Sequence, residues 1–130
     1  MREVHLSEPV ELALSARRSM MLVLRLTTAG VVARAGLTVD RMDDVKLAVE
    51  EACSCLITEA GGPERLRLRF SEADGALRIS VRGEGGNPAA IGEDECEVVR
   101  CVLEALVDGV ELRVDGTAIS EVELRVALGA

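Results

Sequence analysis

The feature that most constrains the fold is a change of hydrophobic period at Arg65. Across Val10–Ile57, apolar residues recur at the three-to-four-residue spacing of a helix. From Arg65 to Phe70 (RLRLRF) and from Ala76 to Arg82 (ALRISVR), apolar and polar residues alternate, as in strands with one buried face. The chain therefore predicts helices followed by an antiparallel hairpin.

The other segments are assigned by the same criteria. Ser7 suits a helix N-cap, Pro9 an early helical position and Gly36 the residue after a helix. Asp74-Gly75 and Asp115-Gly116 are typical of hairpin turns. The expected elements are a strand at Val4–Leu6, helices over Val10–Ala35 and from Thr38 or Asp40 to Ile57, strands at Arg65–Phe70 and Ala76–Arg82, a helix over Glu93–Val107, and strands at Val110–Val114 and Val122–Leu128.

This order, β-α-α-β-β-α-β-β, predicts an α+β fold. The later strands place Leu, Ile and Val on one side and charged residues on the other, so helices are expected to cover one face and water the other. We therefore predict a two-layer sandwich whose sheet is mostly antiparallel, with helices on one face. At 130 residues the chain is expected to form a single domain, 1–130. The residues expected on the wet face are Arg65, Arg67, Arg69, Arg78, Arg113, Arg125, Glu111, Glu121 and Glu123.

Composition argues against two classes of partner. The net charge is −8 and Phe70 is the sole aromatic residue, whereas nucleic-acid binding requires a basic surface and single-strand binding also uses aromatic stacking. We expect no direct contact with nucleic acid. The longest apolar stretch is too short and too charged to span a bilayer, and Met1–Pro9 does not resemble a secretory signal. A cytoplasmic protein without membrane contact is expected.

Four cysteines are present, and they lack the spacing of a zinc site. We expect them to be reduced, to pack as small buried hydrophobic residues and to bind no metal. A metal or redox cluster is the alternative. The four are Cys53, Cys55, Cys96 and Cys101.

Residues Leu24–Ile57 resemble the first half of bacterial anti-sigma factor serine-protein kinases, in the superfamily of gyrase, histidine-kinase and MutL-type ATPases. The second helix of that family typically has the sequence AVSEACTNAI, and Ala48–Ile57 is AVEEACSCLI. Val102–Leu112 (VLEALVDGVEL) resembles the passage after the ATP lid of the family. The resemblance covers about residues 3–128, is thin over 83–101, and implies the histidine-kinase-type ATPase fold.

Family members hold a sigma factor away from RNA polymerase, and with ATP and Mg²⁺ they phosphorylate an anti-sigma antagonist on serine. By this resemblance, Glu51 matches the general base of the family. Cys55 stands where the family has an Asn that binds Mg²⁺. Magnesium requires hard oxygen ligands and a thiol is soft. The resemblance thus implies that the general base is retained but inactive in this chain, and that the metal ligand is lost.

The glycine-rich segment Gly83–Gly92 departs from the family in a second way. Gly83 stands where the family has an Asp that accepts a hydrogen bond from the adenine amino group. Glycine has no acceptor, and hydrogen bonds to charged groups contribute about 1.5–3 kcal/mol. Gly85 matches a family glycine and Asn87 resembles a family Asp, although the loop is about two residues shorter than in the family.

The third departure concerns the lid. The family has a Gly-x-Gly segment whose backbone amides and helix N-terminus hold phosphates. Here Gly92 is the last glycine before the expected helix, and four carboxylates follow it, each repelling a phosphate by about 1 kcal/mol at close range. Cys55, Gly83, Gly85 and Asn87 are therefore expected to form a degenerate ATP site that binds neither ATP nor Mg²⁺. The carboxylates are Glu93, Asp94, Glu95 and Glu97.

The implied function is a regulatory, anti-sigma-factor-like protein that binds a sigma factor and/or an anti-sigma antagonist without ATP turnover. In the family, an arginine aligned with Arg25 contacts both partners, so Arg25 is the expected partner-binding residue. A solvated helix face is the alternative interpretation of Arg25. A homodimer is also expected, by resemblance.

Two other functions stay open. The chain is alternatively an active ATP-dependent serine-protein kinase with a divergent nucleotide site, which Glu51 and Gly85 favour. A third hypothesis is a thiol switch, in which Cys55 and Cys96 face each other across an empty nucleotide pocket.

Overall fold

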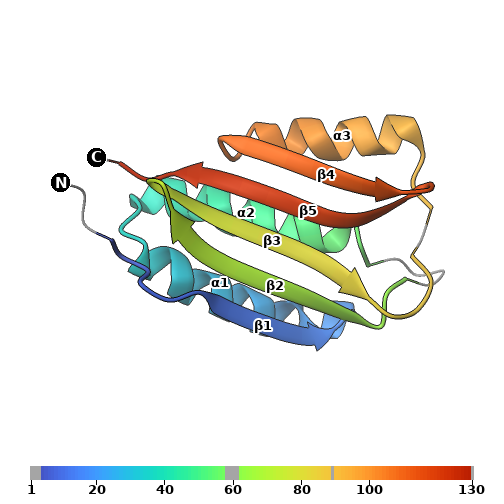
Figure 1. Ribbon diagram of the computed structural model, residues 1–130, viewed down its shortest axis with the longest axis horizontal. Helices are drawn as coiled ribbons and strands as arrows, with labels where there is room; N and C mark the ends of the chain where they lie inside the picture. Colours follow the sequence, from blue (N-terminus) through green and yellow to red (C-terminus); the bar gives the residue numbers. More distant parts are fainter. Residues whose placement is uncertain (1–3, 58–61, 89, 130) are drawn as a thin grey trace.

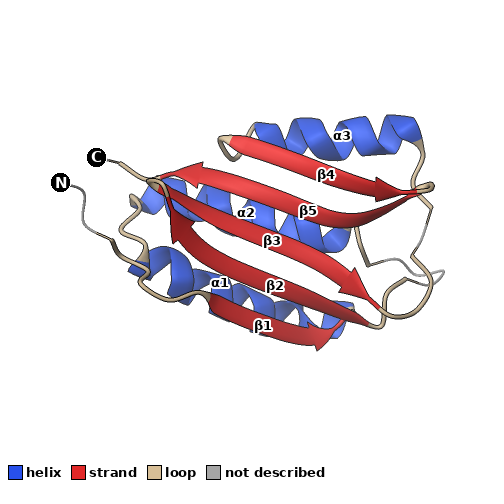
Figure 2. Ribbon diagram, in the orientation of Figure 1, coloured by secondary structure: helices blue, strands red, loops and turns tan. Residues whose placement is uncertain are grey.

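The computed structural model describes residues 4–57, 62–88 and 90–129. These residues form one antiparallel five-stranded sheet in the spatial order β1-β2-β3-β5-β4, with three α-helices on one face (Figures 1 and 2). The expected α+β two-layer sandwich is confirmed. Its elements are β1 (Val10–Ser15), the 3-10 helix η1 (Arg18–Met20), α1 (Met21–Arg34), α2 (Val39–Ser54), β2 (Arg65–Ala73), β3 (Ala76–Glu84), α3 (Glu93–Glu104), β4 (Gly109–Asp115) and β5 (Ala118–Ala127).

The N-terminal region differs from the prediction. Val4–Leu6 is not a strand, and Val10–Ser15, expected to begin the first helix, is strand β1 paired with β2. Ser7 and Pro9 consequently start no helix, and α1 begins only at Met21. The spacing of Val10 and Leu14 suits a helix as well as a strand, and pairing with β2 resolves the ambiguity in favour of the strand.

The helix cap, the helix end and the hairpin turn that follow in the chain are as predicted. The Thr38 side chain caps α2 by accepting a hydrogen bond from the Arg41 amide at 3.3 Å. Gly36, with φ +75°, takes the left-handed position after α1. Asp74 and Gly75 have φ values of 52° and 75°, as a two-residue hairpin turn with two left-handed positions requires. The predicted second helix and first hairpin are therefore confirmed.

The core lies between the sheet and the helices. Each inward-facing strand side chain contributes about 1.5–3 kcal/mol on burial, as an upper estimate. These side chains pack against the inner faces of α1 and α2, while α3 contributes fully buried Leu103. The fully buried strand residues are Leu66, Leu68, Phe70, Leu77, Ile79, Val81, Val122, Leu124 and Val126.

The opposite face of the sheet is charged, as predicted, and carries cross-strand ion pairs. Such exposed pairs contribute little to stability, about 0–1 kcal/mol each. The charged side chains therefore leave this face hydrated and add little to the stability of the sheet. Among the described residues, no helix is long and apolar enough to cross a membrane. The pairs are Arg67–Glu84 (2.6 Å), Arg69–Glu11 (2.9 Å), Arg78–Glu123 (3.7 Å) and Arg113–Glu121 (3.4 Å).

Candidate functional site

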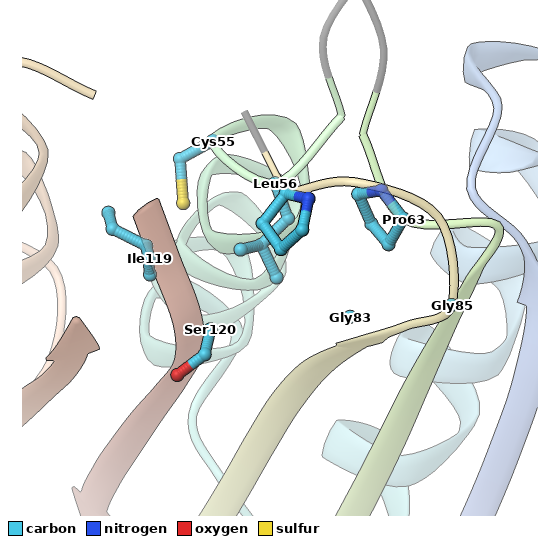
Figure 3. Close-up of a pocket in the computed structure, with 8 residues that line it drawn as sticks. Cys55, Leu56, Pro63, Gly83, Gly85, Ile119 and Ser120 are labelled. Atoms are coloured by element: carbon cyan, nitrogen blue, oxygen red, sulfur yellow. The ribbon is translucent and has the colours of Figure 1, made fainter. Parts of the chain in front are cut away.

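A small cavity lies at the end of the sheet where α2 stops and the β3–α3 loop begins (Figure 3). Its volume is about 50 Å³. Three of the positions selected from the sequence, Cys55, Gly83 and Gly85, line it together although they come from distant parts of the chain. The lining residues are Cys55, Leu56, Pro63, Gly83, Gly85, Pro88, Ile119 and Ser120.

Cys55 is the C-cap residue of α2, and its thiol donates a hydrogen bond to the Ala52 carbonyl at 3.0 Å. Figure 3 shows its sulfur on the side of the cavity formed by Ile119. Burial, and then the proximity of Cys96, raises the pKa of the Cys55 thiol to about 12. The group therefore stays protonated at neutral pH, which suits packing and suits neither metal ligation nor attack on another sulfur.

Pro63 occupies the space beside Gly83, a contact that no pattern in the sequence predicts. A Cβ built on Gly83 would lie 3.0 Å from both Cβ and Cγ of Pro63, closer than side chains normally pack. Figure 3 shows the proline ring above the strand that carries Gly83. The proline segment is held by backbone hydrogen bonds from Glu64 to the Glu84 carbonyl (2.9 Å) and from Ala16 to the Glu64 carbonyl (3.0 Å). In this arrangement a side chain at position 83 requires the proline ring to move by a few tenths of an ångström.

The neighbouring glycines allow a close approach of two chain segments. Gly85 and Gly86 are left-handed, with φ values of +70° and +63°. A Cβ on Gly86 would lie 2.3 Å from the Gly62 carbonyl oxygen, so no other residue fits there without movement. Asn87 is exposed and does not line the cavity. The glycine-rich loop thus packs against the α2–β2 connection.

Residues 90–92, where the resemblance implies the lid, are joined to the β4–β5 turn by backbone contacts. The Ile91 amide donates to the Thr117 carbonyl at 2.7 Å, and Ala90 forms a bridge with Ala118. Helix α3 begins directly after Gly92, which supplies no side-chain cap. Three carboxylates occupy its first turn, where they complement the helix dipole and repel an anion. These are the predicted Glu93, Asp94 and Glu95, all exposed.

Glu51 lies on α2 one turn before Cys55, and its side chain is exposed. It does not line the cavity. The geometric relation between the two residues is the one the sequence suggested, since Cys55 donates its backbone N–H to the Glu51 carbonyl at 3.1 Å. The side chain of Glu51 is therefore accessible to solvent.

Arg25 lies on a different surface, in a groove between the outer sides of α1 and α2. Its guanidinium is ion-paired with Glu50, and its side chain is 57% exposed. The groove has a volume of about 390 Å³ and shares no lining residue with the cavity at Cys55. Leu22 and Leu26, on the same helix as Arg25, are 62% and 66% exposed. The groove residues are Arg25, Leu26, Ala29, Asp43, Lys46, Leu47 and Glu50.

The cysteines do not share one environment, contrary to the prediction that all four are buried. Cys53 is fully buried, and burial raises the pKa of its thiol well above the usual range. Cys55 and Cys96 are half-buried and Cys101 is exposed, because it lies on the side of α3 that faces away from the core. Within the described parts of the chain, no three His, Cys, Asp or Glu side chains are placed to hold a metal ion.

Comparison with known proteins identifies relatives of the kind that the sequence suggested. A family model described as "Histidine kinase-like ATPase domain" matches residues 14–126. The serine-protein kinase RsbW of Halalkalibacterium halodurans is 34% identical over 85 residues, which are 63% of this chain and 51% of that protein. The RsbW of Bacillus mycoides is 38% identical over 80 residues, 60% of this chain and 50% of the relative. The chain spans about half the length of the curated relatives it matches.

A solved structure supports the fold. The crystal structure of the RsbU and RsbW domains of a Mycobacterium tuberculosis protein matches with a TM-score of 0.70 at 18% sequence identity. The match covers 94% of this chain and 33% of that one. At this identity the likeness concerns the fold, and it agrees with the architecture expected from the sequence.

Proposed function

The chain belongs to the histidine kinase-like ATPase domain family, and from this premise we propose that it is a regulatory protein of the anti-sigma-factor type that works without ATP turnover. Its partner in this proposal is a sigma factor and/or an anti-sigma antagonist. Similarity to RsbW serine-protein kinases supports a partner of this class. The main observation that argues against ATP turnover is that Pro63 occupies the space beside Gly83.

Several features of the cavity are unfavourable to a nucleotide. Its volume of about 50 Å³ is small beside the roughly 300–1,000 Å³ of typical ligand sites. The residue at the family metal-ligand position, Cys55, presents a protonated thiol. At the phosphate end, the first turn of α3 presents carboxylates. Together these features disfavour the base, the metal and the phosphates of ATP.

The surface around Arg25, in contrast, is accessible, which supports a role in partner binding. Arg25 lies among exposed apolar side chains of α1 and beside a groove of about 390 Å³. An arginine surrounded by exposed apolar area is the usual composition of a protein-binding hot spot. The Arg25 side chain is 57% exposed and that of its ion-pair partner Glu50 is 26% exposed, so the guanidinium is accessible to a carboxylate of a partner protein.

Calorimetric titration with ATP, with and without Mg²⁺, tests the nucleotide half of the proposal. We expect no binding heat at millimolar nucleotide. The RsbW of Bacillus subtilis, titrated in parallel, serves as the positive control. A dissociation constant in the micromolar range would overturn the proposal that ATP is not used.

The partner-binding part of the proposal is tested by comparing Arg25→Ala with Arg34→Ala. The second variant is a matched control, because Arg34 is an exposed arginine on the same helix. With a purified sigma factor or antagonist of the native host, we expect Arg25→Ala to weaken binding at least tenfold, about 1.4 kcal/mol. Arg34→Ala should leave the affinity unchanged. Equal affinities for the two variants would show that the Arg25 surface is not the binding site.

An active serine-protein kinase is the second candidate function, favoured by the exposed carboxylate of Glu51 one turn before Cys55. It predicts transfer of labelled phosphate from ATP to an antagonist serine, and loss of transfer in Glu51→Gln. Absence of label at millimolar ATP and Mg²⁺ contradicts this candidate.

A further inference from the structure

Helix α3 has two apolar sides, and the fold uses one of them. The inner side packs on the core through buried Leu103 and half-buried Cys96 and Val99. The outer side is exposed, and its members recur at positions i, i+3, i+4 and i+7, the spacing of one helix face. We call it the outer stripe of α3: Val98 (63% exposed), Cys101, Val102 (39% exposed) and Ala105, the C-cap residue.

Carboxylates border the outer stripe. At 100° per residue, Glu97 and Glu104 lie along one side of it and Glu95 along the other. Glu97 pairs with Arg100 at a distance of 3.9 Å, whereas Glu95 and Glu104 make no ion pair within the described part of the chain. The rim is therefore acidic, on a protein whose net charge is already −8.

The composition of the stripe favours a helix as its occupant. Val, Cys and Ala are short side chains, which let a second helix approach closely and pack ridges into grooves. A second copy of this chain is disfavoured, because antiparallel or parallel pairing of two α3 helices would bring two acidic rims together. A helix with apolar residues on one side and Lys or Arg beside them complements both the stripe and its rim.

We propose that the outer stripe of α3 is a docking surface for a basic amphipathic helix. The surface is separate from the one at Arg25. Figure 1 shows α3 along the β4 edge of the sheet, whereas α1 lies behind β1 and β2 at the other edge. Four side chains bury less area than a standard interface, so the affinity for an isolated helix is expected to be about micromolar to millimolar.

The probe is a synthetic 18-residue helix with a Leu and Ala stripe flanked by Lys, added at low salt to the full chain labelled with ¹⁵N. We expect amide shifts centred on α3. The double variant Val98→Ser/Val102→Ser should weaken binding at least tenfold, and Glu97→Gln/Glu104→Gln should remove most of its salt dependence. Val39→Ser, a matched loss of an exposed apolar side chain (70% exposed) at the start of α2, should have no effect. All these positions are exposed, so thermal unfolding should be nearly unchanged in each variant.

Three results would overturn the proposal. The first is that the amide shifts caused by the peptide lie outside α3, or that they persist in the Val98→Ser/Val102→Ser variant. The second is equal binding of a control peptide in which Glu replaces every Lys. The third is self-association in sedimentation experiments that Val98→Ser/Val102→Ser abolishes, since the occupant of the stripe is then a second copy of the chain. Each result is distinguishable from failure of the proposed function, which is measured at Arg25 and with ATP.

Discussion

At the residue scale, the site depends on the contact between Pro63 and Gly83. By resemblance, Gly83 lacks the hydrogen-bond acceptor that the family has at this position. The structure adds that the space for the acceptor is filled, since a Cβ at Gly83 would lie 3.0 Å from the proline ring. An acidic side chain at position 83 and the present packing of Pro63 are therefore expected to interfere with each other.

Gly83→Asp is accordingly expected to destabilise the protein. Overpacking of this kind costs about 1–3 kcal/mol, and Pro63→Ala should recover part of that cost in the double variant. Urea unfolding followed by far-UV circular dichroism provides the measurement. Gly30→Ala is the control, because Gly30 is an exposed helical glycine with nothing within 4 Å of a built Cβ. It should stabilise the protein by about 0.5–1 kcal/mol. A Gly83→Asp protein as stable as the parent would refute the packing argument.

At the element scale, Asp108 and Arg41 fasten α2 to the α3–β4 connection and to β5. Arg41 donates to the Leu106 carbonyl at 2.8 Å and to the Asp108 carboxylate at 2.5 Å. The Ala127 amide donates to the same carboxylate at 2.8 Å. The Ala127 hydrogen bond first, and then Arg41, hold the pKa of Asp108 below its usual range. Three elements thus meet at one carboxylate that folding keeps ionised.

This carboxylate predicts a pH dependence of stability. Because the folded pKa is lowered, its contribution is present above the unfolded pKa of about 3.9 and is lost as pH falls through the folded value. Asp108→Asn should therefore cost about 1 kcal/mol at pH 7, a figure discounted for the partial exposure of the pair, with the difference from the parent closing below about pH 4. Asp115→Asn, at an exposed position, should change little at either pH. Urea unfolding at pH 3, 5 and 7 provides the comparison, and a pH-independent difference for Asp108→Asn would contradict this account.

At the scale of the whole molecule, one helix layer serves core, site and surface at once. The solvent exposure of the cysteines differs accordingly. Cys53 is buried, Cys55 and Cys96 are half-buried, and Cys101 is exposed. The raised pKa of Cys55 argues against the thiol switch considered from the sequence, since a protonated, packed thiol is a poor nucleophile. Burial therefore disfavours thiolate chemistry at Cys53 and Cys55.

Thiol labelling measures these differences in exposure directly. In the native protein we expect iodoacetamide to modify Cys101 first and Cys53 only at the rate of global unfolding, because Cys53 has no accessible surface. In denaturant all four thiols should react alike. Peptide mass spectrometry after timed labelling identifies the order, and Cys101→Ser serves as the control that removes the fast phase. Early labelling of Cys53 would contradict its burial.

Secondary-structure elements that depend on nearby residues could be predicted from the amino-acid sequence. The strands with alternating Leu and Arg, the hairpin at Asp74 and Gly75, and the cap at Thr38 follow from side-chain period and turn chemistry, which depend on neighbours within a few residues. The resemblance over residues 24–57 brought Glu51, Cys55 and Arg25 to attention for the same reason, since they lie on contiguous helical segments.

Other features of the fold depend on contacts between segments that are distant in the sequence. Strand β1 exists because its register with β2 aligns Val10 with Phe70 and Leu14 with Leu66, a pairing across more than fifty residues that no local period specifies. The contact of Pro63 with Gly83 and the exposure of Cys101 likewise depend on how distant segments pack. A residue's type limits what it can do, but the volume and charge around it come from the other segments of the folded chain.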